Sequence, residues 1–152
     1  MIGLLQLLNG RARRNYEGGG TASPEANVRA EDITGAIIDA SITIHRRLGP
    51  GVFESVYETV LASMLSRRGL HVERQRLVGF TFDDIRFDQG FRVDLLVEHS
   101  VIVEVKSLDK LAVVHRKQLL TYLRLMNLRV GLLLNFGAET MKEGITRVTN
   151  DQ

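Results

Sequence analysis

The stretch Phe91–Lys106, FRVDLLVEHSVIVEVK, decides the fold. Apolar and polar residues alternate at a period of two in each half, which predicts two half-buried β-strands. The short polar residues 98–100 between the two halves suit a three-residue turn. Taken literally, this turn sets the register of a hairpin in which Asp94 faces Glu104.

The same register makes Val97 face Val101, and facing residues of an antiparallel pair point to the same side of the sheet. Asp94 and Glu104 therefore share one patch, and Lys106, two residues after Glu104, joins them. Two like charges that face each other destabilise a sheet unless something compensates. A divalent cation is the natural compensation, because hard cations prefer carboxylate oxygens. A polar sheet face with a carboxylate–lysine ion pair is the structural alternative.

Length and composition indicate a soluble globular protein. The chain has 152 residues, of which 44% are hydrophobic and 25% are charged, and its net charge is +2. Any surface for nucleic acid must therefore be local. The absence of cysteine excludes disulfides, cysteine zinc sites and cysteine nucleophiles, and it agrees with a cytoplasmic location. No apolar run is long enough to span a membrane, and we expect no secretory signal.

The chain divides into an expected flexible leader, residues 1–30, and a single domain, residues 31–152. The leader contains a small basic cluster, Arg11, Arg13 and Arg14, followed by a glycine run. A solvated tail is the favoured interpretation of this cluster, and an arm that binds nucleic acid is the alternative.

From residue 31 onward the pattern is regular. Apolar spacing predicts helices at about 32–47 and 52–68, strands at 71–80 and 81–87, the hairpin of 91–106, a helix at 113–126, a strand at 129–135 and a short strand or turn in 136–152. Asp32 is expected to cap the first helix and Gly69 to end the second, with Asp83 and Asp84 as a turn. This order predicts an α/β sandwich around a mixed sheet.

Three further side chains are candidates for the carboxylate patch. Gln118 and Tyr122 are four residues apart on one helix, so they share a face, and the chain connection lays that helix across the sheet near the patch. They could contact a nucleotide and a phosphate, or be a surface glutamine and a packed tyrosine. Glu54 could be a third acidic ligand, or a first-turn glutamate favoured by the helix dipole.

The four histidines show no ligand spacing, and we expect satisfied or surface side chains at all of them: His45, His71, His99 and His115. No serine–histidine–acid order, phosphate-binding loop or dinucleotide fingerprint is present.

Four separated stretches resemble the GxxExxY protein family: LGPGVFESVYE, RVDLLVEHSVIVEVKSLDKL, VHRKQLLTYL and GLLLNFG. Gly51, Glu54 and Tyr57 match the motif that names the family. The family belongs to the PD-(D/E)XK nuclease-like superfamily, whose shared core is αβββαβ. The resemblance covers roughly residues 32–150 and implies this restriction-endonuclease-like core, with a mixed sheet, flanking helices and an extra N-terminal helix.

The resemblance implies roles for the residues of the patch. Asp94 stands at the aspartate of the superfamily, and Glu104 and Lys106 stand at its (D/E)-X-K. Val93 replaces the proline of the motif name, a common departure that leaves the chemistry intact. Beside them, the following residues match the Q-x-x-x-Y motif of the RecB-like branch and the helix glutamate of several members: Gln118, Tyr122 and Glu54.

The resulting hypothesis is a nuclease that depends on Mg²⁺ or Mn²⁺ and cleaves phosphodiesters, with DNA as the favoured substrate. Asp94 and Glu104, with Glu54, would bind the metal. The main alternative is a module that binds nucleic acid or protein and keeps the fold without turnover. A third option is a homodimer assembled through the sheet edge or the first helix.

Overall fold

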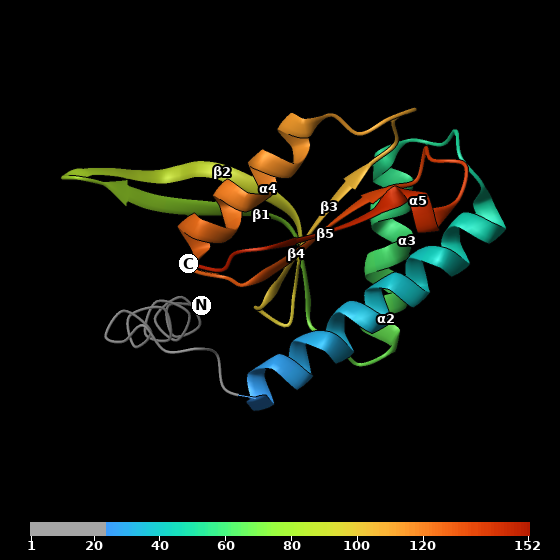
Figure 1. Ribbon diagram of the computed structural model, residues 1–152, viewed down its shortest axis with the longest axis horizontal. Helices are drawn as coiled ribbons and strands as arrows, with labels where there is room; N and C mark the ends of the chain where they lie inside the picture. The colour runs from blue at the N-terminus through green and yellow to red at the C-terminus, as the bar shows by residue number, and fades with distance from the viewer. Residues whose placement is uncertain (1–23) are drawn as a thin grey trace.

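Figure 1 shows the computed structural model, which describes residues 24–152. A single sheet separates two helical layers. Helices α2 (Pro24–Leu48) and α3 (Glu54–Arg67) pack on one face, and α4 (Val113–Met126) packs on the other. The expected leader lies outside the described residues as far as residue 23, and so does its arginine cluster.

The sheet has five strands in the spatial order β1-β2-β3-β4-β5. Their bounds are β1 Val72–Phe82, β2 Ile85–Val97, β3 Val101–Lys106, β4 Val130–Asn135 and β5 Ile145–Thr149. All neighbours are antiparallel except β3 and β4, which are parallel, so the sheet is mixed as predicted. Val97 pairs with Val101, which confirms the register that the short turn predicted.

Several expected boundaries were wrong. Helix α2 begins at Pro24, inside the span expected to be a flexible leader, so Asp32 lies within the helix and does not cap it. The strand expected at 81–87 is the tip of a hairpin, because β1 ends and β2 begins on either side of the turn at Asp83 and Asp84. A short helix, α5 (Met141–Gly144), precedes β5 and was not predicted.

The two hydrophobic layers have different members because strand residues alternate between faces. The layer under α2 and α3 contains Ile37, Ile44, Leu61, Leu65, Leu95, Val103 and Leu132. The layer under α4 contains Val93, Leu96, Ile102, Leu119, Leu123 and Leu133. The apolar row of α2 thus packs on the sheet as part of the core.

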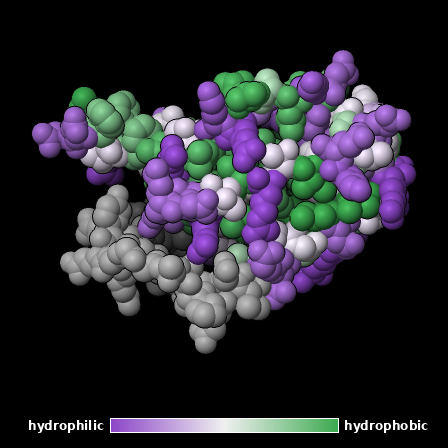
Figure 2. Space-filling view, in the orientation of Figure 1, coloured by the Kyte–Doolittle hydropathy of each residue, from purple (hydrophilic) through white to green (hydrophobic). Residues whose placement is uncertain are grey.

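Strands β1 and β2 extend beyond the rest of the sheet as a two-stranded arm (Figure 1). Hydrophobic side chains are visible towards the free end of this arm in Figure 2, and Phe82, Ile85 and Phe87 are exposed there. Among the helices of the described chain, none combines the length and the apolar character needed to cross a membrane.

Candidate active site

Asp94 and Glu104 lie together where strands β2 and β3 stop pairing. The last Cα pair of the ladder is Leu95 with Val103. Beyond it, the backbone N–H of Asp94 donates to Glu104 Oε1 at 3.2 Å. The backbone N–H of Val105 donates to Asp94 Oδ2 at 2.8 Å. Each carboxylate thus takes the place of a carbonyl acceptor on the opposite strand, which holds both side chains in fixed positions.

The alternation of β2 breaks at Asp94. Leu95 packs under α2 and α3, and Leu96 packs under α4. Strict alternation would place Val93 on the same side as Leu95, yet Val93 packs under α4. This local irregularity explains why the expected direct pair of Asp94 and Glu104 is replaced by hydrogen bonds through their side chains.

Burial makes Glu104 an unusual carboxyl group. Only 5% of its surface is exposed. The pKa of Glu104 is raised from 4.5 to about 8, chiefly by desolvation and secondly by the negative charge of Asp94. The N–H of Asp94 and the ammonium of Lys106 act in the opposite direction. Without a further cation, the site therefore favours a proton on Glu104 at neutral pH.

A hollow of about 430 Å³ opens over this pair, and Lys106, Gln118 and Tyr122 contribute to its walls. The structure thus brings the two α4 residues to the same hollow as the carboxylates, as their spacing predicted. Tyr122 stacks on Phe91 with ring centroids 4.3 Å apart.

The Tyr122 hydroxyl interacts electrostatically with the two carboxylates. Burial raises the pKa of Tyr122, and the charges of Glu104 and Asp94 raise it further. The phenol therefore stays protonated and remains a hydrogen-bond donor at the edge of the site.

A second hollow of about 750 Å³ adjoins the first and shares Asp94 and Arg92 with it. Glu54 lines this second hollow, and its Oε1 accepts from the backbone N–H of Ser107 at 3.2 Å. Across the described residues, the ligand atoms of Asp94, Glu104 and Glu54 do not gather within 4.8 Å of one another. Glu54 is therefore beside the carboxylate pair, without forming a ready three-carboxylate cluster.

Gln75 contacts Asp94 and links it to Glu58, an arrangement that the sequence did not reveal. The Gln75 amide donates to Glu58 Oε2 at 2.7 Å and to Asp94 Oδ1 at 3.4 Å. Glu58 is 6% exposed and also pairs with Arg74 at 3.3 Å. Gln75 has a φ of 50°, a left-handed conformation that is strained for this residue type. These contacts link α3, β1 and β2 around the aspartate.

Arg92 is a second residue that sequence reasoning missed. It is exposed, lines both hollows and forms no ion pair with any residue of the described range. It lies two residues before Asp94 on β2, where the alternation of the strand breaks, so counting by two does not give its direction. A guanidinium in this position suits a phosphate group.

The other motif residues have structural roles. The Tyr57 hydroxyl donates to Gly49 O and accepts from Val52 N–H at 3.4 Å. Its ring stacks on Phe136 at 4.4 Å. Gly51 has a φ of 110°, which a residue with a Cβ rarely adopts. Tyr57 therefore fixes the loop that precedes α3, and this loop sets the position of Glu54.

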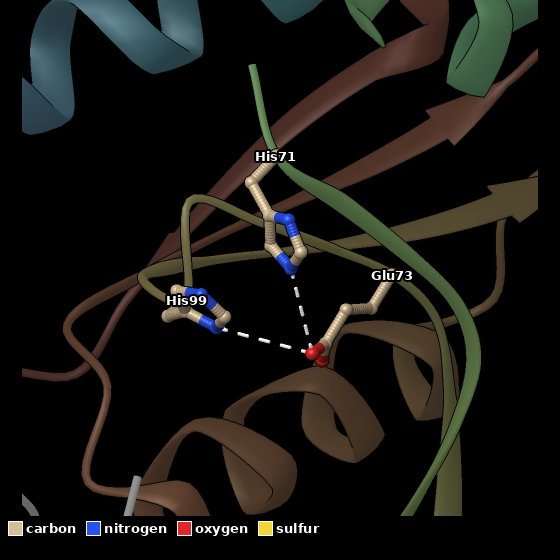
Figure 3. Close-up of side chains that lie close together, drawn as sticks. All are labelled: His71, Glu73 and His99. Carbon is tan, nitrogen blue, oxygen red and sulfur yellow. Dashed lines mark ion pairs between the residues drawn. The ribbon is translucent and has the colours of Figure 1, made fainter. Parts of the chain in front are cut away.

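Two of the histidine positions are informative. His115 has a structural role, because its Nδ1 accepts from Ala112 N–H at 3.0 Å and closes the start of α4. The expectation that no histidines cluster was wrong. His71 and His99 lie side by side next to Glu73, away from the site described above (Figure 3).

The carboxylate pair has the donors that a hard divalent cation requires. Glu104 Oε2 has no hydrogen bond to any described residue, and Glu104 and Asp94 both line the first hollow. Mg²⁺ in proteins is commonly bound by one or two carboxylates, with water and substrate phosphate completing the octahedron. Burial and the charge of Asp94 raise the pKa of Glu104, and a cation bound beside the carboxylate would favour its ionised form.

Comparison of the sequence with known protein families found a match over most of the chain. The sequence model of the PD-(D/E)XK nuclease superfamily matches residues 31–148, which include every residue of the two hollows. No curated protein and no solved structure gave a match. The narrower resemblance to GxxExxY proteins stays a prediction.

Proposed function

This chain belongs to the PD-(D/E)XK nuclease superfamily, and we propose that it is a metal-dependent nuclease that hydrolyses phosphodiester bonds, with DNA as the favoured substrate. The proposal rests mainly on one observation. Backbone N–H groups fix the carboxylates of Asp94 and Glu104 side by side, and both line an open hollow together with Lys106. The placement of all three on adjacent strands matches what phosphodiester hydrolysis needs.

Asp94 and Glu104 are the residues that would hold Mg²⁺ or Mn²⁺, with Glu54 as a third acidic group from the adjoining hollow. When bound, the metal supplies charge neutralisation at the phosphate and a lowered pKa of water. The hydrogen bonds from Asp94 N–H and Val105 N–H keep the two carboxylates oriented. Gln75 restrains Asp94 from the other side.

Cationic side chains take the substrate charge in this proposal. Lys106 lines the hollow with the carboxylates, where its ammonium can bind a non-bridging phosphate oxygen and stabilise the charge of the pentacovalent phosphorus. Arg92 lies between the two hollows and can bind the neighbouring phosphate. Water adds to phosphorus, one P–O ester bond breaks, and the products are a phosphate monoester and a free hydroxyl.

Gln118 and Tyr122 are proposed to orient the substrate. Both lie on the α4 wall of the hollow, where the amide can donate or accept and the phenol can donate. The stacking of Tyr122 on Phe91 fixes the ring and leaves the hydroxyl as its polar end.

The direct test is cleavage of single- and double-stranded DNA and RNA by the purified chain with Mg²⁺, Mn²⁺ or chelator. The proposal predicts cleavage that needs a divalent cation and is lost in Asp94→Ala. Wild type that cleaves nothing above the Asp94→Ala background, with either metal and on every substrate, contradicts it.

A second candidate function is binding of nucleic acid without turnover. The observation that favours it is the tendency of Glu104 to hold a proton when no cation is bound. In that case wild type and Glu104→Gln bind a DNA duplex equally well, and neither cleaves it.

The homodimer considered above also stays a prediction, which light scattering tests.

A further inference from the structure

Three potential metal ligands meet at the end of the sheet opposite the carboxylate pair. His71 precedes β1, Glu73 lies on β1, and His99 lies in the turn between β2 and β3. His71 Nε2 is 3.6 Å from Glu73 Oε1, and His99 Nδ1 is 4.0 Å from the same oxygen. Figure 3 shows both rings directed at this carboxylate.

The spacing of these atoms is close to that of a metal site. One atom from each side chain lies within 4.8 Å of the other two. Tetrahedral zinc with bonds of about 2.0–2.1 Å places its ligand atoms roughly 3.3 Å apart. The side chains of His71 and His99 are 50% and 34% exposed, so small rotations would close the gap.

The two carboxylate oxygens of Glu73 have different partners. Its Oε2 accepts from Arg76, and its Oε1 faces the two imidazoles. An arginine held to the distal oxygen is the kind of outer contact that orients a ligating carboxylate. Glu73 is therefore fixed with one oxygen available.

His99 Nδ1 is a buried polar atom without a hydrogen-bond partner. An orphan of this kind is costly and calls for a ligand. The His71 and His99 ring centroids are 4.5 Å apart, so both rings are near enough to share one ion. A divalent cation held by both imidazoles and by Glu73 gives the orphan atom a partner.

The backbone already holds the two histidine segments together. His71 N–H donates to Glu98 Oε1 at 2.7 Å, and Glu98 N–H donates to His71 O at 2.8 Å. Arg29 of α2 pairs with the same carboxylate at 3.0 Å. The segments that carry His71 and His99 are thus held together without an ion, which lowers the entropic cost of ordering the ligands when an ion binds.

The turn that presents His99 is strained. Ser100 N–H donates to Val97 O at 3.1 Å, and Glu98 and His99, the central residues, have φ values of 52° and 54°. Glycine or asparagine is the usual occupant of such positions. Strain that persists in a turn is commonly associated with function, and the imidazole at this position supplies the third ligand atom.

We propose that His71, Glu73 and His99 form a second metal site, selective for divalent transition cations of the Zn²⁺ class and separate from the Asp94–Glu104 pair. Imidazole nitrogens suit such cations, whereas Mg²⁺ prefers an all-oxygen set. Three protein ligands leave room for water as the fourth ligand. A bound ion joins the start of β1 to the β2–β3 turn and so stabilises the folded state.

The test is Zn²⁺ binding by isothermal titration calorimetry, with the full chain carrying Glu104→Gln and with excess Mg²⁺ present. This background removes one proposed ligand of the other site. The proposal predicts one Zn²⁺ per chain, with affinity about ten-fold or more weaker in His99→Asn and in His71→Gln. The matched control is His45→Gln, whose amide can still donate to Ala138 O, and its affinity stays unchanged.

Both histidine variants are expected to fold, so a loss of Zn²⁺ binding can be attributed to the lost ligand. Asparagine tolerates the left-handed conformation of position 99, and His71→Gln keeps the backbone bonds with Glu98. If the turn variant does not fold, the His71 variant decides. Absence of Zn²⁺ binding, or equal affinity in the His71 variant and the His45 control, overturns the proposal. A Zn²⁺-induced rise in melting temperature that disappears in His71→Gln supports it.

Discussion

Glu104 Oε1 accepts the backbone N–H of Asp94 at 3.2 Å, so two acidic residues on neighbouring strands are joined by a hydrogen bond and not by a ladder pair. This contact places a nearly buried carboxyl group against a second carboxylate. The arrangement is tolerable when Glu104 is protonated or when a cation lies between the two. Both conditions lead to measurable consequences.

The first consequence concerns stability without metal. The pKa of Glu104 is about 8 in the folded state and 4.5 as the ordinary value. Between these pH values the folded state binds the extra proton, so the free energy of unfolding falls as pH rises, by up to about 1.4 kcal/mol per pH unit. Urea unfolding in chelator from pH 5 to pH 8 measures this slope. Glu104→Gln should flatten it, and a wild-type slope equal to that of the variant would falsify the assignment.

The second prediction separates charge stabilisation from metal binding. Lys106→Met removes the ammonium from the hollow and leaves Asp94 and Glu104 in place. We expect cleavage to slow about a hundred-fold or more, because a preorganised charge at the phosphate is lost. Mn²⁺ affinity should be unchanged or higher, since a neighbouring positive charge has gone. Single-turnover cleavage and calorimetry measure the two effects, and cleavage at the wild-type rate would contradict the role of Lys106.

A third prediction concerns substrate affinity. Arg92→Gln should weaken DNA binding and make the slope of log affinity against log salt shallower by about one. The effect should be similar for unrelated sequences, because a phosphate contact does not read bases. Fluorescence anisotropy at several salt concentrations checks it. Arg86→Gln is the matched control, since Arg86 is paired with Asp88 at 3.0 Å on the exposed arm. An equal change in both variants argues against Arg92.

Tyr57 provides a test of structure apart from chemistry. Tyr57→Phe removes the hydroxyl that bridges Gly49 and Val52 and keeps the stacking on Phe136. We expect a loss of about 0.5–1.5 kcal/mol in the free energy of unfolding, because the partly buried hydrogen bonds of the hydroxyl to the loop are lost. Mn²⁺ affinity at the carboxylate pair should change little. A variant as stable as wild type in urea would show that the loop does not depend on this hydroxyl.

The centre of the site could be predicted from the sequence because its residues lie close together along the chain, on either side of one short turn. A short turn fixes the register between β2 and β3, and the helix expected at 113–126 has the bounds of α4. Asp94, Glu104 and Lys106 lie within a dozen or so residues of one another, so period-two counting reaches them. Their roles in catalysis remain predictions.

The contacts made by β1 could not be read in the same way. Counting back from the turn at the end of the arm puts Gln75 opposite Arg92. The register shift between Val78 and Phe80 moves Gln75 to face Asp94 instead. A bulge of this kind has no clear sequence signal. It also determines which residues of β2 and the following turn meet the start of β1, so the histidine cluster escaped notice.

The start of helix α2 could not be predicted from the sequence, for a different reason. Its first turns lack a strong apolar stripe, and the glycine-rich stretch before it favoured a flexible leader. Propensity alone does not locate the start of a helix whose later turns are held by tertiary packing.

The location of Mn²⁺ in crystals of the protein, determined by anomalous scattering, tests the central claim most directly. The account predicts a peak within bonding distance of both Asp94 and Glu104 carboxylates, and its loss in Asp94→Asn. Asparagine can still accept from Val105 N–H, so the strands should keep their positions. Carboxylates too far apart to share one ion, or a well-ordered site without a peak at saturating Mn²⁺, would contradict it.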